Sequence, residues 1–254
     1  MNFFFGFKNE FIQSELTIPK FNFQGEKIEN TYKVFSAEIL NKSWKIDQTK
    51  INEDDNFFKI DQSEINNKKI FFLSNNKELK IDKNNQGFLH TLFNFNSSAD
   101  NDLVQFRSNL KIFNSKGGFS SYQSDYNYNL CRQGGNILSP ISPLLNKNAT
   151  ENFIIFRNIS LEPENNKFKY YFICLKSEKI LDQGLISSNI SNEIRVDNTL
   201  IKDSVFLFTE NILGIPIFVT VDNYHISMEH THPPHQYILT RDNFDLVKNI
   251  KNKF

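Results

Sequence analysis

Cysteine, glycine, proline and net charge are all scarce in this chain. Its 254 residues include 2 Cys, 9 Gly and 7 Pro, which excludes a disulfide scaffold, a collagen-like repeat and a linker-rich chain. The 29 Lys and Arg residues balance 29 Asp and Glu residues, so no bulk charge attracts nucleic acid or an anionic membrane surface. Hydrophobic residues, in contrast, make up 39% of the chain, enough for the core of one large domain or two ordinary ones.

Long hydrophobic runs are lacking as well. The apolar run at residues 3–7 has no basic residue before it, unlike a secretory signal peptide. The longest nearly uncharged stretch, residues 204–221, is too short and too polar to cross a bilayer. Cys131 and Cys174 show no metal-type spacing. We therefore expect a reduced, cytoplasmic protein with no membrane span and no nucleic-acid partner.

Alternation of apolar and polar side chains is the dominant pattern, and it is clearest along residues 104–112. A period of two is typical of a β-strand with one buried face. Similar short runs follow one another with turn-rich gaps, and hardly any helical period occurs. The sequence therefore predicts an all-β fold, an antiparallel β-sandwich of jelly-roll or immunoglobulin-like type, with two β units in series. The other predicted strands are residues 32–40, 70–73, 88–95, 153–159, 168–175, 205–208 and 215–221.

A turn-rich segment at residues 114–118 interrupts the strand pattern and predicts a domain boundary. We expect an N-terminal β-sandwich domain over residues 1–115 and a C-terminal one over residues 116–254. Residues 132–150 contain Gly-Gly and two Ser-Pro pairs but no strand pattern. A loop of that length in a compact domain is typically functional or mobile.

A short C-terminal helix is the one exception to the β pattern. Asp242 can cap it, and Phe244, Val247, Ile250 and Phe254 follow at helical spacing. Lysines lie toward its end, where the helix dipole favours cations. The helix either closes one end of a sandwich or forms the contact of a homo-oligomer.

Four of the five histidines lie close together, at positions 225, 230, 232 and 235. Short histidine-rich tracts are typical of metal binding. His230 and His232 form a His-x-His pair that can converge on Zn²⁺, Fe²⁺ or Mn²⁺, with His235 or His90 as a third ligand. Two alternatives remain: the pair is structural and hydrogen-bonded, or it binds a ligand directly.

A hairpin turn predicts which histidines share a face. A two-residue turn at Asp222-Asn223 would pair Val221 with Tyr224 and Ile215 with His230. His230 and His232 would then continue the apolar face of the second strand at the rim of the sandwich. His225 and Glu229 would point the other way.

Residues 230–233 read His-Thr-His-Pro, and residues 87–94 carry His90 near their centre. These segments resemble, respectively, the first motif and the end of the second motif of the cupin family. The resemblance implies a metal-dependent enzyme whose ligands are His230, His232 and His90. Here the two segments occur in reverse order, and Gln236 stands where the family has a glutamate ligand.

A second cluster follows the predicted boundary. Tyr122, Asp125, Tyr126 and Tyr128 combine flat rings with polar groups, which is equipment for holding sugars, and Glu229 is a further candidate for ligand binding. The alternative is an ordinary strand and turn with tyrosines at its rim. The cluster gains interest if it shares a cleft with the loop at residues 132–150.

No complete catalytic set is present: the serines lack a Gly-x-Ser-x-Gly context, and no glycine-rich phosphate loop occurs. The sequence therefore favours a non-catalytic β-sandwich protein that binds a glycan or a protein partner, with or without a divalent metal. The alternative hypothesis is a metal-dependent, cupin-like enzyme that uses the pair His230 and His232.

Overall fold

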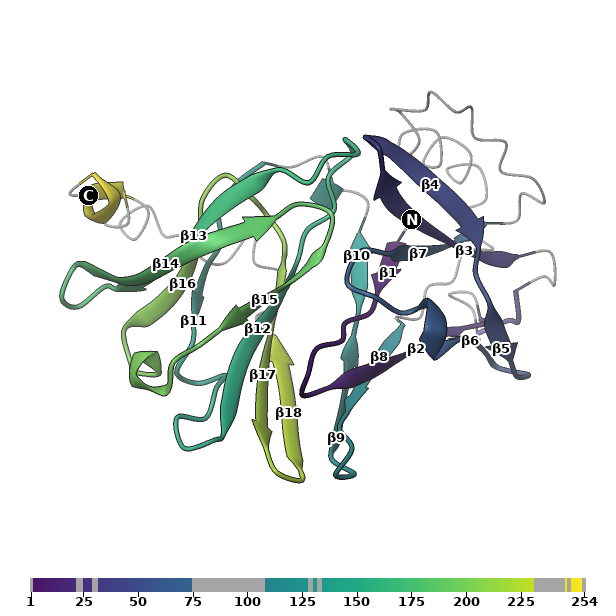
Figure 1. Cartoon of the computed structure of the whole chain (residues 1–254), viewed down its shortest axis with the longest axis horizontal. Coiled ribbons are helices and arrows are strands. Elements are labelled where there is room, and N and C mark those ends of the chain that lie inside the picture. Colours follow the sequence, from purple (N-terminus) through teal and green to yellow (C-terminus); the bar gives the residue numbers. More distant parts are fainter. Residues whose placement is uncertain are drawn as a thin grey trace. The chain divides into compact units, whose positions relative to one another are not determined.

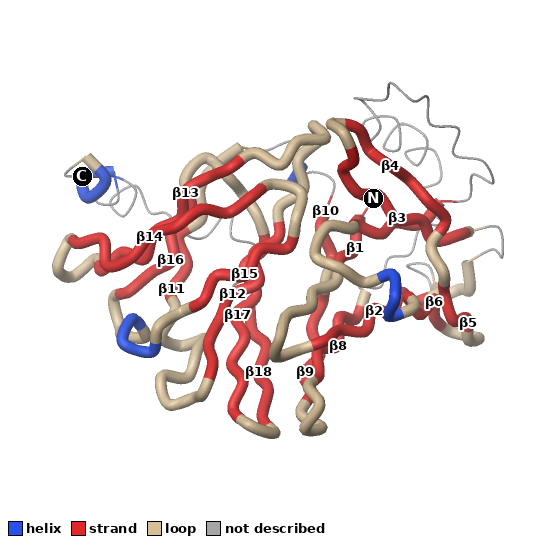
Figure 2. The backbone as a smooth tube through the Cα atoms, viewed as in Figure 1, coloured by secondary structure: helices blue, strands red, loops and turns tan. Residues whose placement is uncertain are grey.

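The computed structural model describes residues 2–21, 25–28, 32–74, 108–127, 130–131, 134–230, 245 and 248–252. The fold is all-β, with antiparallel sheets and a short helical segment near the C-terminus, as the sequence predicts (Figures 1 and 2). The 3₁₀ helices of the described residues include η1 (Gln62–Glu64) and η3 (Asn198–Leu200). The strands are β1 (Asn2–Phe5), β2 (Gln13–Pro19), β3 (Lys33–Leu40), β4 (Ser43–Gln48), β5 (Ile51–Glu53), β6 (Phe57–Ile60), β7 (Ile70–Ser74), β8 (Asn109–Phe113), β9 (Phe119–Gln123), β10 (Asp125–Asn127), β11 (Leu138–Pro140), β12 (Glu151–Arg157), β13 (Lys167–Cys174), β14 (Lys179–Ser187), β15 (Ser191–Arg195), β16 (Val205–Thr209), β17 (Ile215–Asp222) and β18 (His225–His230).

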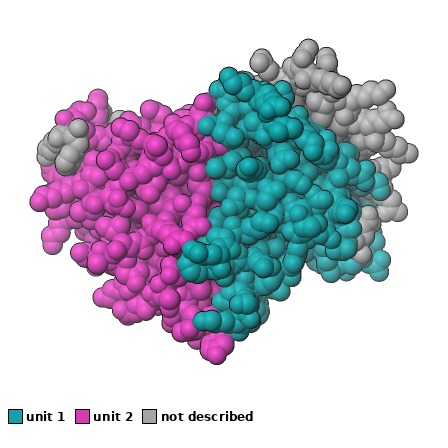
Figure 3. Space-filling model, in the orientation of Figure 1, with its two compact units in different colours: residues 1–132, 159–165, 189–191 teal, residues 133–158, 166–188, 192–254 magenta. Residues whose placement is uncertain are grey.

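The chain divides into two compact units (Figure 3). The strands β9 and β10 lie after the boundary predicted at residues 115 and 116, yet they pair with β8 and β1 of the first unit. Unit 1 comprises Met1–Arg132, Ile159–Asn165 and Asn189–Ser191, and unit 2 comprises Gln133–Asn158, Asn166–Ser188 and Asn192–Phe254.

Unit 1 contains two five-stranded sheets, with the strand orders β10-β1-β7-β3-β4 and β5-β6-β2-β8-β9. In β2, the buried residues Ser14, Leu16 and Ile18 alternate with more exposed neighbours, so one face of the strand meets a core. That core draws on strands of both sheets, including Phe4 and Phe71 from one sheet and Leu16 and Phe58 from the other. The two sheets therefore pack as a sandwich.

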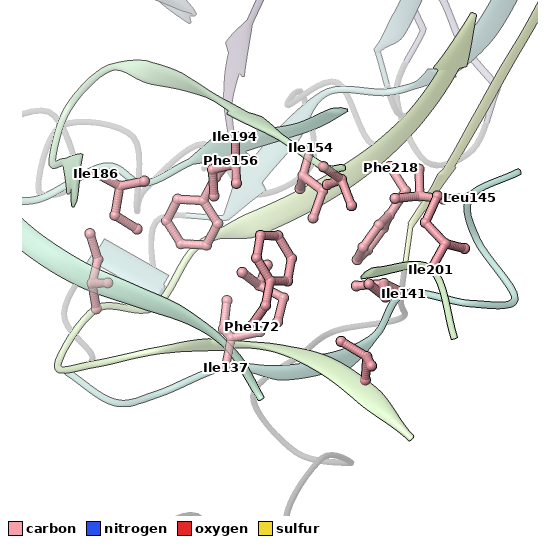
Figure 4. Close-up of a cluster of buried hydrophobic side chains, with 14 of the residues drawn as sticks. Ile137, Ile141, Leu145, Ile154, Phe156, Phe172, Ile186, Ile194, Ile201 and Phe218 are labelled. Atoms are coloured by element: carbon pink, nitrogen blue, oxygen red, sulfur yellow. The ribbon is translucent and has the colours of Figure 1, made fainter. Parts of the chain in front are cut away.

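Unit 2 contains two four-stranded sheets, β11-β16-β13-β14 and β15-β12-β17-β18. Their facing sides share one apolar core, in which Phe156 and Phe218 of one sheet pack with Phe172 of the other (Figure 4). In the central strand β12, Phe153 and Ile155 are also buried on the opposite face. Burial on both faces explains the continuous apolar run in this strand.

The hairpin of β17 and β18 corrects one sequence prediction. The two turn residues are Asn223 and Tyr224, because Asp222 stays in the ladder opposite His225. There it accepts a hydrogen bond from Thr150 Oγ1 at 2.8 Å, while Asn223 adopts a φ of 53°. Asparagine tolerates that left-handed conformation better than most residues. The predicted pairs are therefore each displaced by two residues, so the side chains within β18 keep their predicted faces, whereas Tyr224 leaves the ladder for the turn.

Candidate ligand groove of unit 2

An open groove with a volume of about 530 Å³ lies between two segments of unit 2. One wall is the loop at residues 141–150, which follows β11 and is part of the long loop singled out from the sequence. The other wall is the segment at residues 201–203, between η3 and β16. The lining residues are Ser142, Leu145, Asn146, Lys147, Asn148, Ile201, Lys202 and Asp203.

One buried side chain, that of Asn152 in β12, is 3% exposed and is attached to the first wall and to η3, the helix that leads into the second wall. Its amide oxygen accepts hydrogen bonds from Thr220 Oγ1 at 2.8 Å and from the Asn146 backbone N–H at 3.3 Å. Its amide nitrogen donates to the Asn146 carbonyl at 2.8 Å and to Asn198 Oδ1 at 2.9 Å. Asn198 Nδ2 in turn donates to the carbonyl of Ala149 at 2.9 Å.

This network holds the groove in one geometry before any ligand arrives. Leaving a buried amide without its partners is costly, so the two walls cannot separate without breaking several hydrogen bonds. At the rim, Ser142 Oγ donates to Asp203 Oδ1 at 2.9 Å and joins the walls a second time. Asp197 caps η3 by accepting from the Thr199 backbone N–H, and hydrogen bonds from Thr199 lower the pKa of the Asp197 carboxyl.

Polar groups of several kinds line the groove. Lys147 and Lys202 supply ammonium groups, Asn148 an amide and Asp203 a carboxylate. Asn146, Lys147 and Asn148 are exposed to solvent. Such a set can bind hydroxyl groups and anionic oxygens.

The histidine cluster is described only in part. His230 ends β18 and is half-buried, opposite Ile217, whereas His225 and Glu229 are exposed on the other face. His232, His235 and His90 lie outside the described residues. Among the residues that the structure describes, no three His, Cys, Asp or Glu side chains gather to hold a metal ion. The Zn²⁺, Fe²⁺ or Mn²⁺ site stays a prediction, testable by metal analysis of the purified chain.

The tyrosine cluster, for which the sequence leaves open a set of rings that holds sugars or an ordinary strand and turn, lies in β9 and β10 where it is described. Tyr126, in β10, is fully buried, and Tyr122, in β9, is half-buried. Asp125 Oδ1 accepts hydrogen bonds from the Ser108 backbone N–H at 3.0 Å and from Ser108 Oγ at 2.8 Å. Tyr128 lies outside the described residues. The described part of this cluster therefore helps to hold unit 1 together.

The described residues of the C-terminal segment pack on the face of a sheet. Ile250 is fully buried against the outer face of the sheet that contains β13 and β16. Lys251 forms an ion pair with Glu210, and its Nζ lies 5.9 Å and 5.4 Å from the ring centres of Tyr171 and Phe208. Tyr171 Oη donates to Glu210 Oε2 at 3.0 Å, and burial together with Glu210 raises the pKa of Tyr171 to about 12.

Comparison with known proteins gives no relative: no family model, no curated protein and no solved structure matches this chain. No helix among the described residues is long and apolar enough to cross a membrane. Local sequence patterns do not indicate the groove, because its second wall begins about fifty residues after the end of the first wall. The length of the loop at residues 132–150 was the one signal that pointed toward it.

Proposed function

We propose that this chain is a non-catalytic binding protein and that unit 2 holds a glycan in the groove beside Asn152. One observation carries the proposal. The groove is lined with amide, ammonium, hydroxyl and carboxylate groups, and the network of Asn152 joins its two walls. Binding loses less free energy to ordering when the site is formed in advance.

The size and chemistry of the groove suit a sugar. A volume of about 530 Å³ lies within the range of small-ligand sites and leaves room for a short oligosaccharide. Sugar hydroxyl groups both donate and accept hydrogen bonds, so amides and carboxylates can bind them in pairs. Leu145 and Ile201 add small apolar surfaces on which the C–H groups of a sugar ring can pack.

A glycan array probed with the full chain tests this proposal, followed by calorimetric titration of each glycan that binds. Asn148→Ala should weaken binding about fivefold, because one hydrogen-bonding amide is worth about 1 kcal/mol. Gln183→Ala is the matched control, since Gln183 is an exposed amide on β14 and outside the groove lining. It should leave the affinity unchanged.

Three results would overturn the proposal. The array shows no glycan that binds; a protein binds at the groove while no glycan does; or Asn148→Ala and Gln183→Ala bind the glycan as tightly as the wild type. A reaction product in the titrated mixture would also contradict a non-catalytic role.

A further inference from the structure

The walls of the groove contribute one lysine each. Lys147 belongs to the loop at residues 141–150, and Lys202 to the segment that follows η3. Among the described lining residues, opposite charge comes from Asp203 alone, so this part of the groove has a positive excess although the whole chain is neutral. A local excess of one sign selects ligands of the other sign.

Hydrogen-bonding capacity in the groove is also unbalanced. Each ammonium group offers several N–H donors and no acceptor, and the side-chain amide of Asn148 adds more donors. On the acceptor side, Asp203 Oδ1 is already engaged by Ser142 Oγ. Each hydroxyl group brings an O–H donor of its own, for which this lining offers few acceptors. Carboxylate and sulfate groups have only acceptor oxygens and would match it.

From this excess of donors and positive charge, we propose that the ligand is an acidic glycan whose carboxylate or sulfate group binds between Lys147 and Lys202. The inference rests on the proposed function and adds the chemical class of the ligand. Neutral hydroxyl groups of the same glycan would bind Asn148 and the free oxygen of Asp203. The ion pairs form at an open groove, so dissolved salt screens them and their effect on affinity is moderate.

The test compares two probes that differ in charge and share one sugar frame, tetragalacturonate and its methyl ester. Both are titrated calorimetrically into the full chain at low salt and at about 0.5 M NaCl. The acid should bind about tenfold more tightly than the ester at low salt, since charge-assisted hydrogen bonds are the stronger ones. High salt should remove most of that difference. A sulfated tetrasaccharide without uronic acid, derived from carrageenan, distinguishes a sulfate from a carboxylate as the preferred group.

Variants of single lysines show which lysine side chains bind the acidic group. Lys147→Gln and Lys202→Gln should each bring the affinity for the acid close to that for the ester, with the ester itself little changed. Lys179→Gln removes an exposed lysine of β14, outside the groove lining, and should leave both affinities as they are.

The outcomes distinguish a failure of the acidic ligand class from a failure of the proposed glycan-binding function. Equal affinity for the acid and the ester, with both weakened by Asn148→Ala, overturns the acidic class and retains a glycan ligand. Failure of every glycan on the array to bind overturns the proposed function itself. Acid binding that survives both lysine variants places the ligand elsewhere. Competition by inorganic sulfate at the concentrations at which the tetrasaccharides bind would show an anion site without glycan specificity, and would overturn the inference.

Discussion

Asn152 in unit 2 and Asp125 in unit 1 each join separate segments of the chain through several hydrogen bonds. Asn152 connects the loop that contains Asn146 with η3, and beyond those partners lies an open groove. Asp125 joins β10 to the start of β8 at Ser108, whose hydroxyl is 3.0 Å from that of Ser124. Both of those serines are fully buried.

The difference between the two networks lies in what surrounds them. In unit 2, the loop held by Asn152 presents exposed polar side chains to a cavity. In unit 1, the neighbour of Asp125 is Tyr126, whose ring is fully buried. A buried polar network therefore does not by itself indicate a binding site; it does so where the segment that it holds still has unburied polar groups.

The largest loss of stability and of glycan affinity is expected from Asn152→Asp. The carboxylate can still accept from Thr220 and from the Asn146 N–H, but it cannot donate to the Asn146 carbonyl or to Asn198. Two part-buried acceptors lose their donor and face a buried carboxylate instead, so the free energy of unfolding should fall by about 3 kcal/mol. Glycan affinity should fall at least tenfold, because the walls lose their common attachment. Urea denaturation and calorimetric titration measure the two effects.

A smaller loss of stability is expected from Thr220→Val, which changes a different residue of the same hydrogen-bond network. It removes one donor to Asn152 Oδ1, which keeps its bond from the Asn146 N–H. The loss of stability should be about 1 kcal/mol, with the affinity little changed. Full glycan affinity in Asn152→Asp would show that the groove does not depend on this network.

A loss of stability between those of Asn152→Asp and Thr220→Val, with no loss of binding, is expected from Asp125→Ala. Ser108 would lose the acceptor of its backbone N–H, while its hydroxyl keeps Ser124 as a partner. The cost should be about 2 kcal/mol in the unfolding of unit 1. Glycan affinity should be that of the wild type, since Asp125 does not line the groove. A weakened affinity in the folded variant would contradict the contrast drawn between the two networks.

Strands in the cores were the most predictable part of the fold. The predicted run at residues 168–175 lies within one residue of β13, and that at 215–221 within one residue of β17. Their apolar side chains pack on the cores, so burial leaves a trace in the sequence. β14 was not predicted, because it is an edge strand with mostly exposed residues and a register shift opposite Phe172 and Ile173.

The groove was less predictable, for a physical reason. The loop at residues 132–150 could be recognised by its length, whereas the bond from Asn152 to Asn198 joins residues 46 positions apart. Local sequence patterns do not predict a contact between residues so far apart in the chain. For the cluster around Tyr126, the sequence left open a set of rings that holds sugars or an ordinary strand and turn, and the ring of Tyr126 is buried.

The smallest change in stability is expected at a third polar group, the carboxylate of Glu210, which binds Lys251 of the C-terminal segment. Burial alone would raise the pKa of its carboxyl, but hydrogen bonds from Lys251 and Tyr171 outweigh burial and lower the pKa below its usual 4.5. Because the folded pKa lies below the unfolded one, the stabilisation is present above pH 4.5 and is lost as the pH falls through the folded pKa. The two side chains are 23% and 27% exposed, so solvent still reaches the ion pair and its contribution should be about 0.5–1 kcal/mol.

Denaturation by urea at pH 7 and in acid, for the wild type and Glu210→Gln, measures this contribution. The two proteins should differ at pH 7 and converge in acid, because protonation removes in the wild type what the substitution has already removed. Glu229→Gln, at an exposed position on β18, is the control and should follow the wild type at both pH values. A constant difference between Glu210→Gln and the wild type would mean that the carboxyl holds the C-terminal segment by packing and not by its charge. Glu210 would then resemble Asp125, whose hydrogen bonds are expected to stabilise the fold without affecting binding.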